Sequence, residues 1–178
     1  MASTTDARPD IDDFIRDIPD FPKPGIVFKD ITPLLADSTA FGAAIDQMAE
    51  LIADLKIDVI AAAEARGFLF AAPLSLKLDR GMVPIRKPGK LPYKKRSYSY
   101  ELEYGTDTLE MHIDGIQPGQ NVLVIDDLLA TGGTVEACCK MIEESDAKVV
   151  GCLFLIELGF LDGAKRLADY PLFSLLKY

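Results

Sequence analysis

The sequence VLVIDDLLATGGT at residues 122–134 has the pattern of a buried strand that leads into a helix. Its first half is an apolar, β-branched run, which is typical of a parallel strand covered on both faces. Two carboxylates, Asp126 and Asp127, follow this run, and a turn of small residues comes after them. Because ligands of open α/β sheets bind beyond the carboxyl ends of the strands, we expect a small-molecule site here.

The turn of small residues has the composition of an anion site. Gly132 and Gly133 lack a Cβ, so the backbone can turn tightly and approach a ligand. Consecutive N–H groups and the positive end of the following helix suit a phosphate monoester. We therefore predict that a phosphate binds to Ala130, Thr131, Gly132, Gly133 and Thr134.

The two aspartates indicate a different partner, because carboxylates repel a phosphate. Asp126 and Asp127 suit the cis-diol of a sugar, or a divalent cation bound through water. A diol held beside a phosphate indicates a ribose 5-phosphate. A strand that ends in two aspartates also occurs in nucleotide-binding proteins, but the motif G-x-x-x-x-G-K-S/T that they need is not in the sequence.

Segment 122–134 resembles the phosphoribosyl pyrophosphate (PRPP) signature of type I phosphoribosyltransferases. Further segments are similar, in order and spacing, to the adenine-specific members of that family. They are FPKPGIVFKDITP at 21–33, EARGFLF at 64–70, and RKPGKLP at 86–92 followed by LEYG at 102–105. The resemblance implies an enzyme that converts adenine and PRPP to AMP and pyrophosphate with Mg²⁺, and that works as a homodimer.

The order of the expected elements fits the fold of that family. Helices are predicted at 11–17, 39–55, 68–78, 135–144 and 163–168, and strands at 59–63, 82–86, 108–113, 122–125, 149–157 and 173–176. Their alternation predicts an α/β fold with a doubly wound, mostly parallel sheet. The resemblance adds a small N-terminal hood and a mobile active-site loop at 87–107 within a single domain over residues 1–178, and the N-terminal sequence, which lacks the form of a signal peptide, predicts a flexible leader at 1–13. The strand at 108–113 is predicted to be exposed, and the loop is long and polar with few core anchors.

The resemblance also assigns roles outside the signature. Phe28 stacks on adenine, while backbone groups at Val27 and Lys29 read the edge of the base. Glu103 accepts or relays the proton that adenine loses. Lys87 and Lys90 meet the pyrophosphate when the loop closes.

A second anion site is predicted where a strand meets a helix at EARG, residues 64–67. Arg66 there offers a planar, forked donor for phosphate oxygens. The family usually has a serine at the position of Ala65, so this chain lacks one hydroxyl donor. The sequence alone also allows plainer interpretations: an exposed arginine, a local core anchor at Phe28, and a surface glutamate at Glu103, as is expected of Glu101 and Glu110.

Composition limits the possible functions. The chain has 178 residues, of which 49% are hydrophobic, and a net charge of −9, which argues against nucleic acid as a partner. No apolar run approaches the roughly 18 residues that span a membrane. The cysteines, Cys138, Cys139 and Cys152, have no metal-ligand spacing, so we expect buried thiols and a cytoplasmic protein. The lone histidine, His112, is expected to be structural.

Two other functions are compatible with the signature. One is a type I transferase for guanine, hypoxanthine, xanthine or orotate, against which the segment around Phe28 argues. The other is a regulator that binds PRPP without catalysis and contacts nucleic acid. The acidic net charge and Glu103 argue against that regulator.

Overall fold

The computed structural model of the protein describes residues 8–101 and 106–178, and it divides the chain into two compact units that meet between Gln47 and Met48. None of the helices among these residues is long and apolar enough to cross a bilayer. Each unit is described separately below.

The first unit holds a small antiparallel sheet. Strand β1 (Arg16–Pro19) pairs with β2 (Val27–Asp30), and the ion pair between Arg16 and Asp30, 2.6 Å long, ties the two strands together. The predicted helix at 11–17 is therefore wrong in its second half, and only the 3-10 helix η1 (Ile11–Phe14) forms. Two helices complete the unit: α1 (Thr32–Ala36), which was not predicted, and α2 (Ser38–Leu51), which continues into the second unit.

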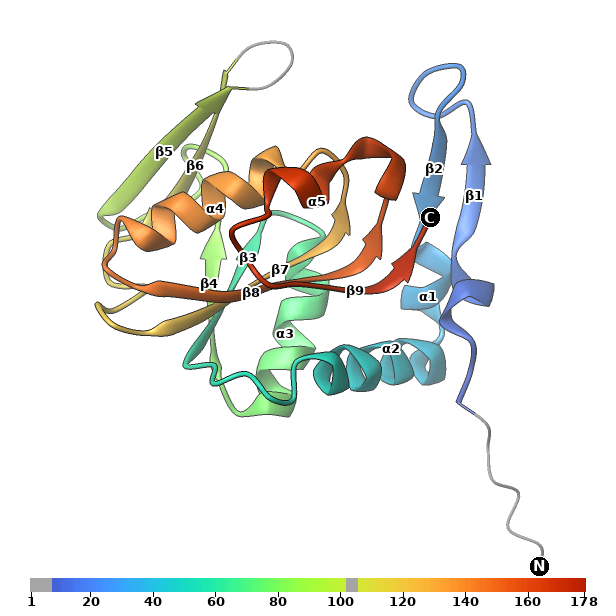
Figure 1. Ribbon diagram of the computed structural model, residues 1–178, viewed down its shortest axis with the longest axis horizontal. Coiled ribbons are helices and arrows are strands. Elements are labelled where there is room, and N and C mark those ends of the chain that lie inside the picture. Colours follow the sequence, from blue (N-terminus) through green and yellow to red (C-terminus); the bar gives the residue numbers. More distant parts are fainter. Residues whose placement is uncertain (1–7, 102–105) are drawn as a thin grey trace, which may run out of the picture. The chain divides into compact units, whose positions relative to one another are not determined.

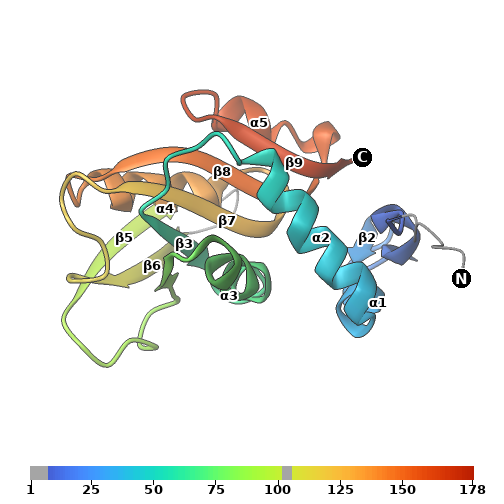
Figure 2. The ribbon, with the colours of Figure 1, turned by 90° about the horizontal axis from the view of Figure 1, so that it is seen from below.

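The second unit is built on a five-stranded sheet in the order β4-β3-β7-β8-β9, and every neighbouring pair is parallel. Figure 1 shows helices α3 (Gly67–Leu78) and α4 (Gly133–Glu143) on opposite faces of this sheet, and the view from below in Figure 2 agrees. This arrangement confirms the predicted doubly wound parallel sheet. The strands are β3 (Val59–Ala63), β4 (Gly81–Ile85), β7 (Asn121–Leu129), β8 (Lys148–Glu157) and β9 (Leu172–Lys177).

Strand β7 is longer than predicted. It continues through both aspartates to Leu129, because Leu128 and Leu129 pair with Ile156 and Glu157 of β8. Asp126 and Asp127 consequently lie inside the strand rather than after it. Adjacent strand residues point to opposite faces of a sheet, so the two carboxylates leave the backbone in different directions.

A second correction concerns the segment predicted as a long loop. Strand β5 (Lys95–Glu101) forms within it and pairs with β6 (Thr106–His112) as an antiparallel hairpin, while residues 102–105 between them lie outside the described part. Helix α4 packs against β5. Strand β6 is not exposed as predicted, since Leu109, Glu110 and Met111 are buried.

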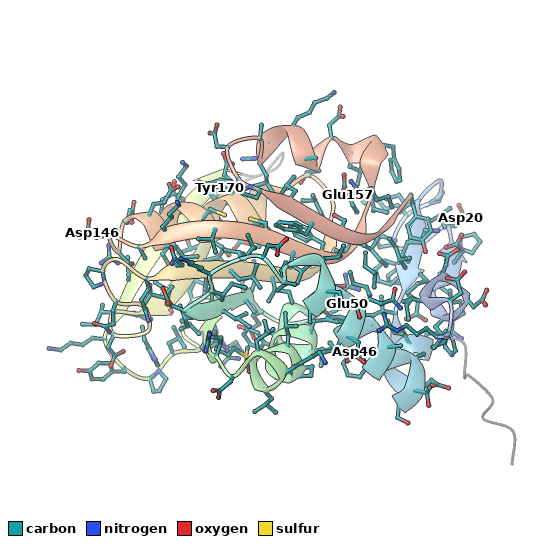
Figure 3. The ribbon with its side chains drawn as sticks, turned by 60° about the horizontal axis from the view of Figure 1, so that its bottom comes forward. Asp20, Asp46, Glu50, Asp146, Glu157 and Tyr170 are labelled. Atoms are coloured by element: carbon teal, nitrogen blue, oxygen red, sulfur yellow. The ribbon has the colours of Figure 1, made fainter. Side chains whose placement is uncertain are left out.

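Polar contacts also tie the last two strands together and join helix α4 to the segment before β9; Figure 3 labels two of the residues that make them, Glu157 and Tyr170. Glu157, the last residue of β8, accepts a hydrogen bond of 2.7 Å from the Ser174 hydroxyl of β9. The Tyr170 hydroxyl donates to Glu143 at the end of α4, and burial raises the pKa of Tyr170 to about 12. Between β8 and β9 lie the 3-10 helix η2 (Gly159–Leu161) and helix α5 (Gly163–Arg166).

The cysteines behave as predicted. Cys138 and Cys139 of α4 and Cys152 of β8 are free thiols and fully buried. They pack between the helix and the sheet as small apolar side chains.

Candidate active site

The small-residue turn between β7 and α4 forms a cavity of about 100 Å³ at the carboxyl end of the central strand. All five residues of the predicted phosphate site line it, together with Asp126. Gly132 adopts a φ of +82°, which side-chain-bearing residues rarely adopt, and it is the residue from which α4 begins. The backbone N–H groups at this helix start lack intrahelical acceptors and suit an anion.

Two acids lie near the end of β7: Asp126 is partly buried and lines the cavity, and Asp127 is buried next to it in the strand. Asp127 is 4% exposed, and its Oδ2 lies 3.0 Å from Nε of Arg66, which forms an ion pair with it. This pair does not have hydrogen-bond geometry, so within the described residues Asp127 Oδ2 is a buried oxygen without a hydrogen-bond partner. Such an oxygen is costly unless a ligand hydroxyl satisfies it.

Burial sets the electrostatics of the acid pair. It raises the pKa of Asp126 well above the usual value of 3.8, and the neighbouring charge of Asp127 raises it further. Burial also raises the pKa of Asp127, while the guanidinium of Arg66 acts in the opposite direction. Asp126 is fixed in place because its Oδ1 accepts the backbone N–H of Asp127 at 2.9 Å.

The predicted second anion site joins the acid pair. Arg66 lies between the end of β3 and the start of α3, and the peptide bond between Glu64 and Ala65 is cis. A Cβ added to Gly67 would lie 3.0 Å from both Asp126 Oδ1 and the Ile125 carbonyl oxygen. Only a glycine therefore lets this loop approach β7 so closely.

The loop after β4 is anchored to the same junction. Arg86 forms two hydrogen bonds with Glu64, of 3.0 and 3.1 Å, and these lower the pKa of Glu64. The backbone N–H of Lys87 donates to Glu64, and the Lys90 carbonyl accepts from Arg86. Lys87 and Lys90 are thus carried by a loop attached to the predicted pyrophosphate site.

Several charged residues that the sequence did not single out belong to this region. Glu110, expected on the surface, is 5% exposed and accepts hydrogen bonds from Gly89 N–H and Lys95 Nζ. Arg166 of α5 pairs with Glu136, and its guanidinium lies against Gly133. These partners are distant in the sequence, so only the alternation of β6 could have indicated that Glu110 lies on a structured strand.

The predicted adenine-binding residues lie on β2 in the first unit. Phe28 makes an edge-to-face contact with Phe21, at 5.2 Å between ring centroids, and Lys29 pairs with Asp17. The sheet has two strands, so one edge of β2 has no strand partner among the described residues. On that edge, alternate residues present backbone N–H and C=O groups for hydrogen bonding.

One predicted catalytic residue, Glu103, lies outside the described residues. His112, which was expected to be structural, makes an edge-to-face contact with Tyr93 at 6.0 Å between ring centroids.

The described residues contain no group of three or more histidine, cysteine or acidic side chains that could hold a metal ion. The donor set does fit a cation that arrives with its own ligands. Asp126 and Asp127 are neighbouring carboxylates whose pKa values are raised mainly by burial, and a hydrated divalent cation would offset that cost of their charge.

Residues 34–174 match the model of the phosphoribosyl transferase domain family. This match covers most of the parallel sheet and the turn after its central strand, and it places the chain in the phosphoribosyltransferase family. The adenine phosphoribosyltransferase of Maridesulfovibrio salexigens is 61% identical over 93% of this chain and 97% of its own length. That of Rhodopirellula baltica is 59% identical over 95% of this chain and 82% of its own length.

Solved structures of adenine phosphoribosyltransferases are also similar to this chain. The crystal structure of adenine phosphoribosyltransferase from Thermoanaerobacter pseudethanolicus has a TM-score of 0.92 and 55% identity, covering 94% of this chain and 98% of that one. The enzyme from Saccharomyces cerevisiae, solved with an imino-altritol bisphosphate and adenine, has a TM-score of 0.87 and 38% identity over 93% of this chain and 96% of its own. The chain belongs to the adenine phosphoribosyltransferase family and is a transferase.

Proposed function

We propose that this protein transfers the 5-phosphoribosyl group of PRPP to adenine and releases AMP and pyrophosphate. The observation that supports this proposal is the cavity at the start of α4, which is lined by residues 130–134 and Asp126, while the next residue of β7, Asp127, has a buried oxygen without a hydrogen-bond partner among the described residues. A ribose 5-phosphate carries both complementary groups, a terminal phosphate and a pair of hydroxyls, on one small molecule.

We assign the two ends of PRPP to the two loops at the carboxyl edge of the sheet. Residues 130–134 hold the 5-phosphate, and Asp126 with Asp127 holds the ribose hydroxyls. Arg66, Lys87 and Lys90 bind the pyrophosphate. Arg66 can do so while it remains paired with Asp127, because a guanidinium has five N–H donors.

Mg²⁺ belongs to this proposal as a companion of PRPP rather than as a resident ion. Asp126 and Asp127 would contact its water ligands, and the ion would neutralise charge on the pyrophosphate. The protein's own part is to offset the remaining negative charge with Arg66 and Lys90 as pyrophosphate leaves C1 of the ribose. Most of the acceleration comes from holding two small reactants in line.

Adenine is assigned to β2. Phe28 stacks on the purine, and backbone groups near Val27 and Lys29 recognise its amino edge. A 6-oxopurine reverses the donor and acceptor at that edge and would leave buried groups unpaired, which makes adenine the preferred base. Glu103 accepts or relays the proton that adenine loses, and residues 87–107 close over the reactants to exclude water.

We also propose that the protein is a cytoplasmic homodimer. Three free thiols suit a reducing compartment. Helix α3 is apolar on most of its surface, which is typical of a covered helix, yet Leu69 is 43% and Leu76 84% exposed in the single chain. A second copy that packs on this face would cover both side chains.

A base panel tests the reaction. The protein is incubated with Mg²⁺–PRPP and adenine, guanine, hypoxanthine, xanthine or orotate in turn, and the nucleoside monophosphate is measured. We expect AMP from adenine and little product from the other bases. Product from guanine but not from adenine would overturn the assignment.

A variant tests the assigned sugar site. Replacing Asp127 with Asn removes the charge and keeps the shape, so it is expected to raise the KM for PRPP while the KM for adenine changes little. An unchanged KM for PRPP would show that the ribose binds elsewhere.

A further inference from the structure

Four side chains form a continuous polar chain from the basic loop to the phosphate cradle. Lys87 pairs with Asp107 of β6, and the Tyr100 hydroxyl of β5 lies 3.3 Å from Asp107 Oδ2. The same Tyr100 hydroxyl lies 3.2 Å from Oγ1 of Thr134, which lines the cavity at the start of α4. This row of side chains connects the β5–β6 hairpin to the cradle.

The hydroxyl of Tyr100 is held in a fixed place. Tyr100 and Asp107 are directly opposite each other in the hairpin, and Tyr100 is 8% exposed in the core against which α4 packs. Burial raises the pKa of Tyr100, so this side chain keeps its proton at neutral pH. Lys87 lowers the pKa of Asp107, which is therefore an ionised acceptor.

The number of available protons determines the direction of the hydrogen bonds among these side chains. Asp107 can only accept hydrogen bonds, and Tyr100 has a single proton that can go either to Asp107 or to Thr134. In the structure the Tyr100 hydroxyl donates to Asp107, so the Thr134 hydroxyl donates to Tyr100. When a phosphate oxygen in the cavity accepts the Thr134 hydrogen bond instead, Tyr100 can turn its own proton to Thr134, because Lys87 still satisfies Asp107. Without Lys87, Asp107 would retain the Tyr100 proton and Thr134 would keep donating to Tyr100.

We propose that Tyr100 is a positioning residue of the 5-phosphate cradle, which orients the Thr134 hydroxyl and is itself set by the Asp107–Lys87 pair. The inference rests on the proposed function, because it takes the cradle to be the site of the 5-phosphate. Lys87 acquires a second role: besides meeting pyrophosphate, it prepares the far end of the site for the ribose phosphate.

The test measures binding of ribose 5-phosphate by titration calorimetry, since this ligand has no pyrophosphate for Lys87 to touch. Replacing Tyr100 with Phe removes the hydroxyl and keeps the ring, and it is expected to raise the Kd about fivefold. Thr134→Val is expected to raise the Kd by at least as much. In the Thr134→Val background, the Tyr100→Phe change should have no further effect, because the group through which it acts is gone.

Two further variants separate positioning from folding. Lys87→Met is expected to raise the Kd in the wild-type background, and to raise it by a smaller factor in the Thr134→Val background. Tyr98→Phe removes a hydroxyl two residues earlier on β5, at a side chain packed against the same core, and should leave the Kd unchanged. The midpoint of thermal unfolding of each variant confirms that it is folded at the assay temperature.

The outcomes distinguish the inference from the proposal beneath it. If Thr134→Val leaves the Kd of ribose 5-phosphate unchanged, the cradle is not the 5-phosphate site and the proposed assignment fails. If Thr134→Val weakens binding but Tyr100→Phe does not, or if their effects multiply in the double variant, Tyr100 does not act through Thr134 and the inference is overturned. If Tyr100→Phe does not fold, the Lys87→Met comparison decides alone.

Discussion

At Asp126, burial and the charge of Asp127 act in the same direction, and both disfavour the ionised carboxylate. The pKa of Asp126 is therefore higher in the folded chain than in the unfolded chain. A group with this sign stabilises the fold below its unfolded pKa, and that stability is lost as pH rises through the folded pKa. Above its unfolded pKa, this acid therefore lowers the stability of the unliganded protein.

Replacing Asp126 with Asn should consequently stabilise the unliganded protein at neutral pH, by on the order of 1 kcal/mol, and weaken PRPP binding. The asparagine Oδ1 can still accept the N–H of Asp127, so the local backbone is retained. Urea unfolding at neutral pH and again in mild acid measures the effect, and the gain should shrink in acid. Asp114→Asn, at an exposed aspartate, serves as the control. A destabilised variant at neutral pH would contradict this account of the acid pair.

The predicted role of Glu103 depends on its ability to take up the proton that adenine loses. A glutamine at this position cannot take up the proton that adenine releases, so Glu103→Gln should lower kcat by about 100-fold. The Kd of PRPP, measured separately, should stay within the error of the wild-type value, because this side chain is assigned to the base rather than to the sugar. Equal turnover in the two proteins would remove Glu103 from the mechanism.

At the scale of single elements, the sequence predicted the sheet strands and the helices of the second unit because short apolar runs indicate buried strands and the helical period indicates helices. Strand β3 and helix α4 begin and end within two residues of their predicted limits. Strand β5 was missed because lysine and arginine at its start suggested a polar loop, although Arg96, Tyr98 and Tyr100 alternate with exposed residues. The end of β7 was missed because pairing with β8, rather than local pattern, decides where it stops.

The junction of β3 and α3 offers a test of close packing between elements. Gly67→Ala places a methyl group 3.0 Å from the Ile125 carbonyl oxygen, and backbone cannot move aside easily. We expect the free energy of unfolding to fall by about 1–3 kcal/mol, and the KM for PRPP to rise because Asp126 is displaced. Both quantities are measured on the same preparation.

A glycine inside α2 provides the matched contrast. A Cβ at Gly42 would meet no atom within 4 Å, and the residue lies in the interior of a helix. Gly42→Ala is therefore expected to stabilise the protein by about 0.5–1 kcal/mol without altering the KM for PRPP. If both alanine variants changed stability by the same amount, the close approach at Gly67 would not explain its effect.

At the scale of the whole molecule, the sequence indicated the candidate site residues. It did not indicate the ion pairs and hydrogen bonds that hold them in place. The signature at residues 122–134 predicted the cradle, and the structure gathers those residues around one cavity. The pairs Arg66–Asp127, Glu64–Arg86 and Lys87–Asp107 join residues 20 or more positions apart. No local period encodes such pairs, because they result from the parallel order of the strands, which brings distant loops to one edge of the sheet.

The exposed face of α3 leads to the last prediction, which concerns assembly. If a second copy covers Leu69 and Leu76, the protein should sediment as a dimer at micromolar concentration. Leu76→Glu places a charge on that face and should shift the protein to the monomer, because an unpaired charge is costly to bury. Leu51→Glu, at a leucine 40% exposed on α2, should leave the dimer intact. Sedimentation velocity distinguishes the cases: a Leu76→Glu variant that stays dimeric would place the interface on another face, and a monomeric wild-type protein would refute the dimer itself.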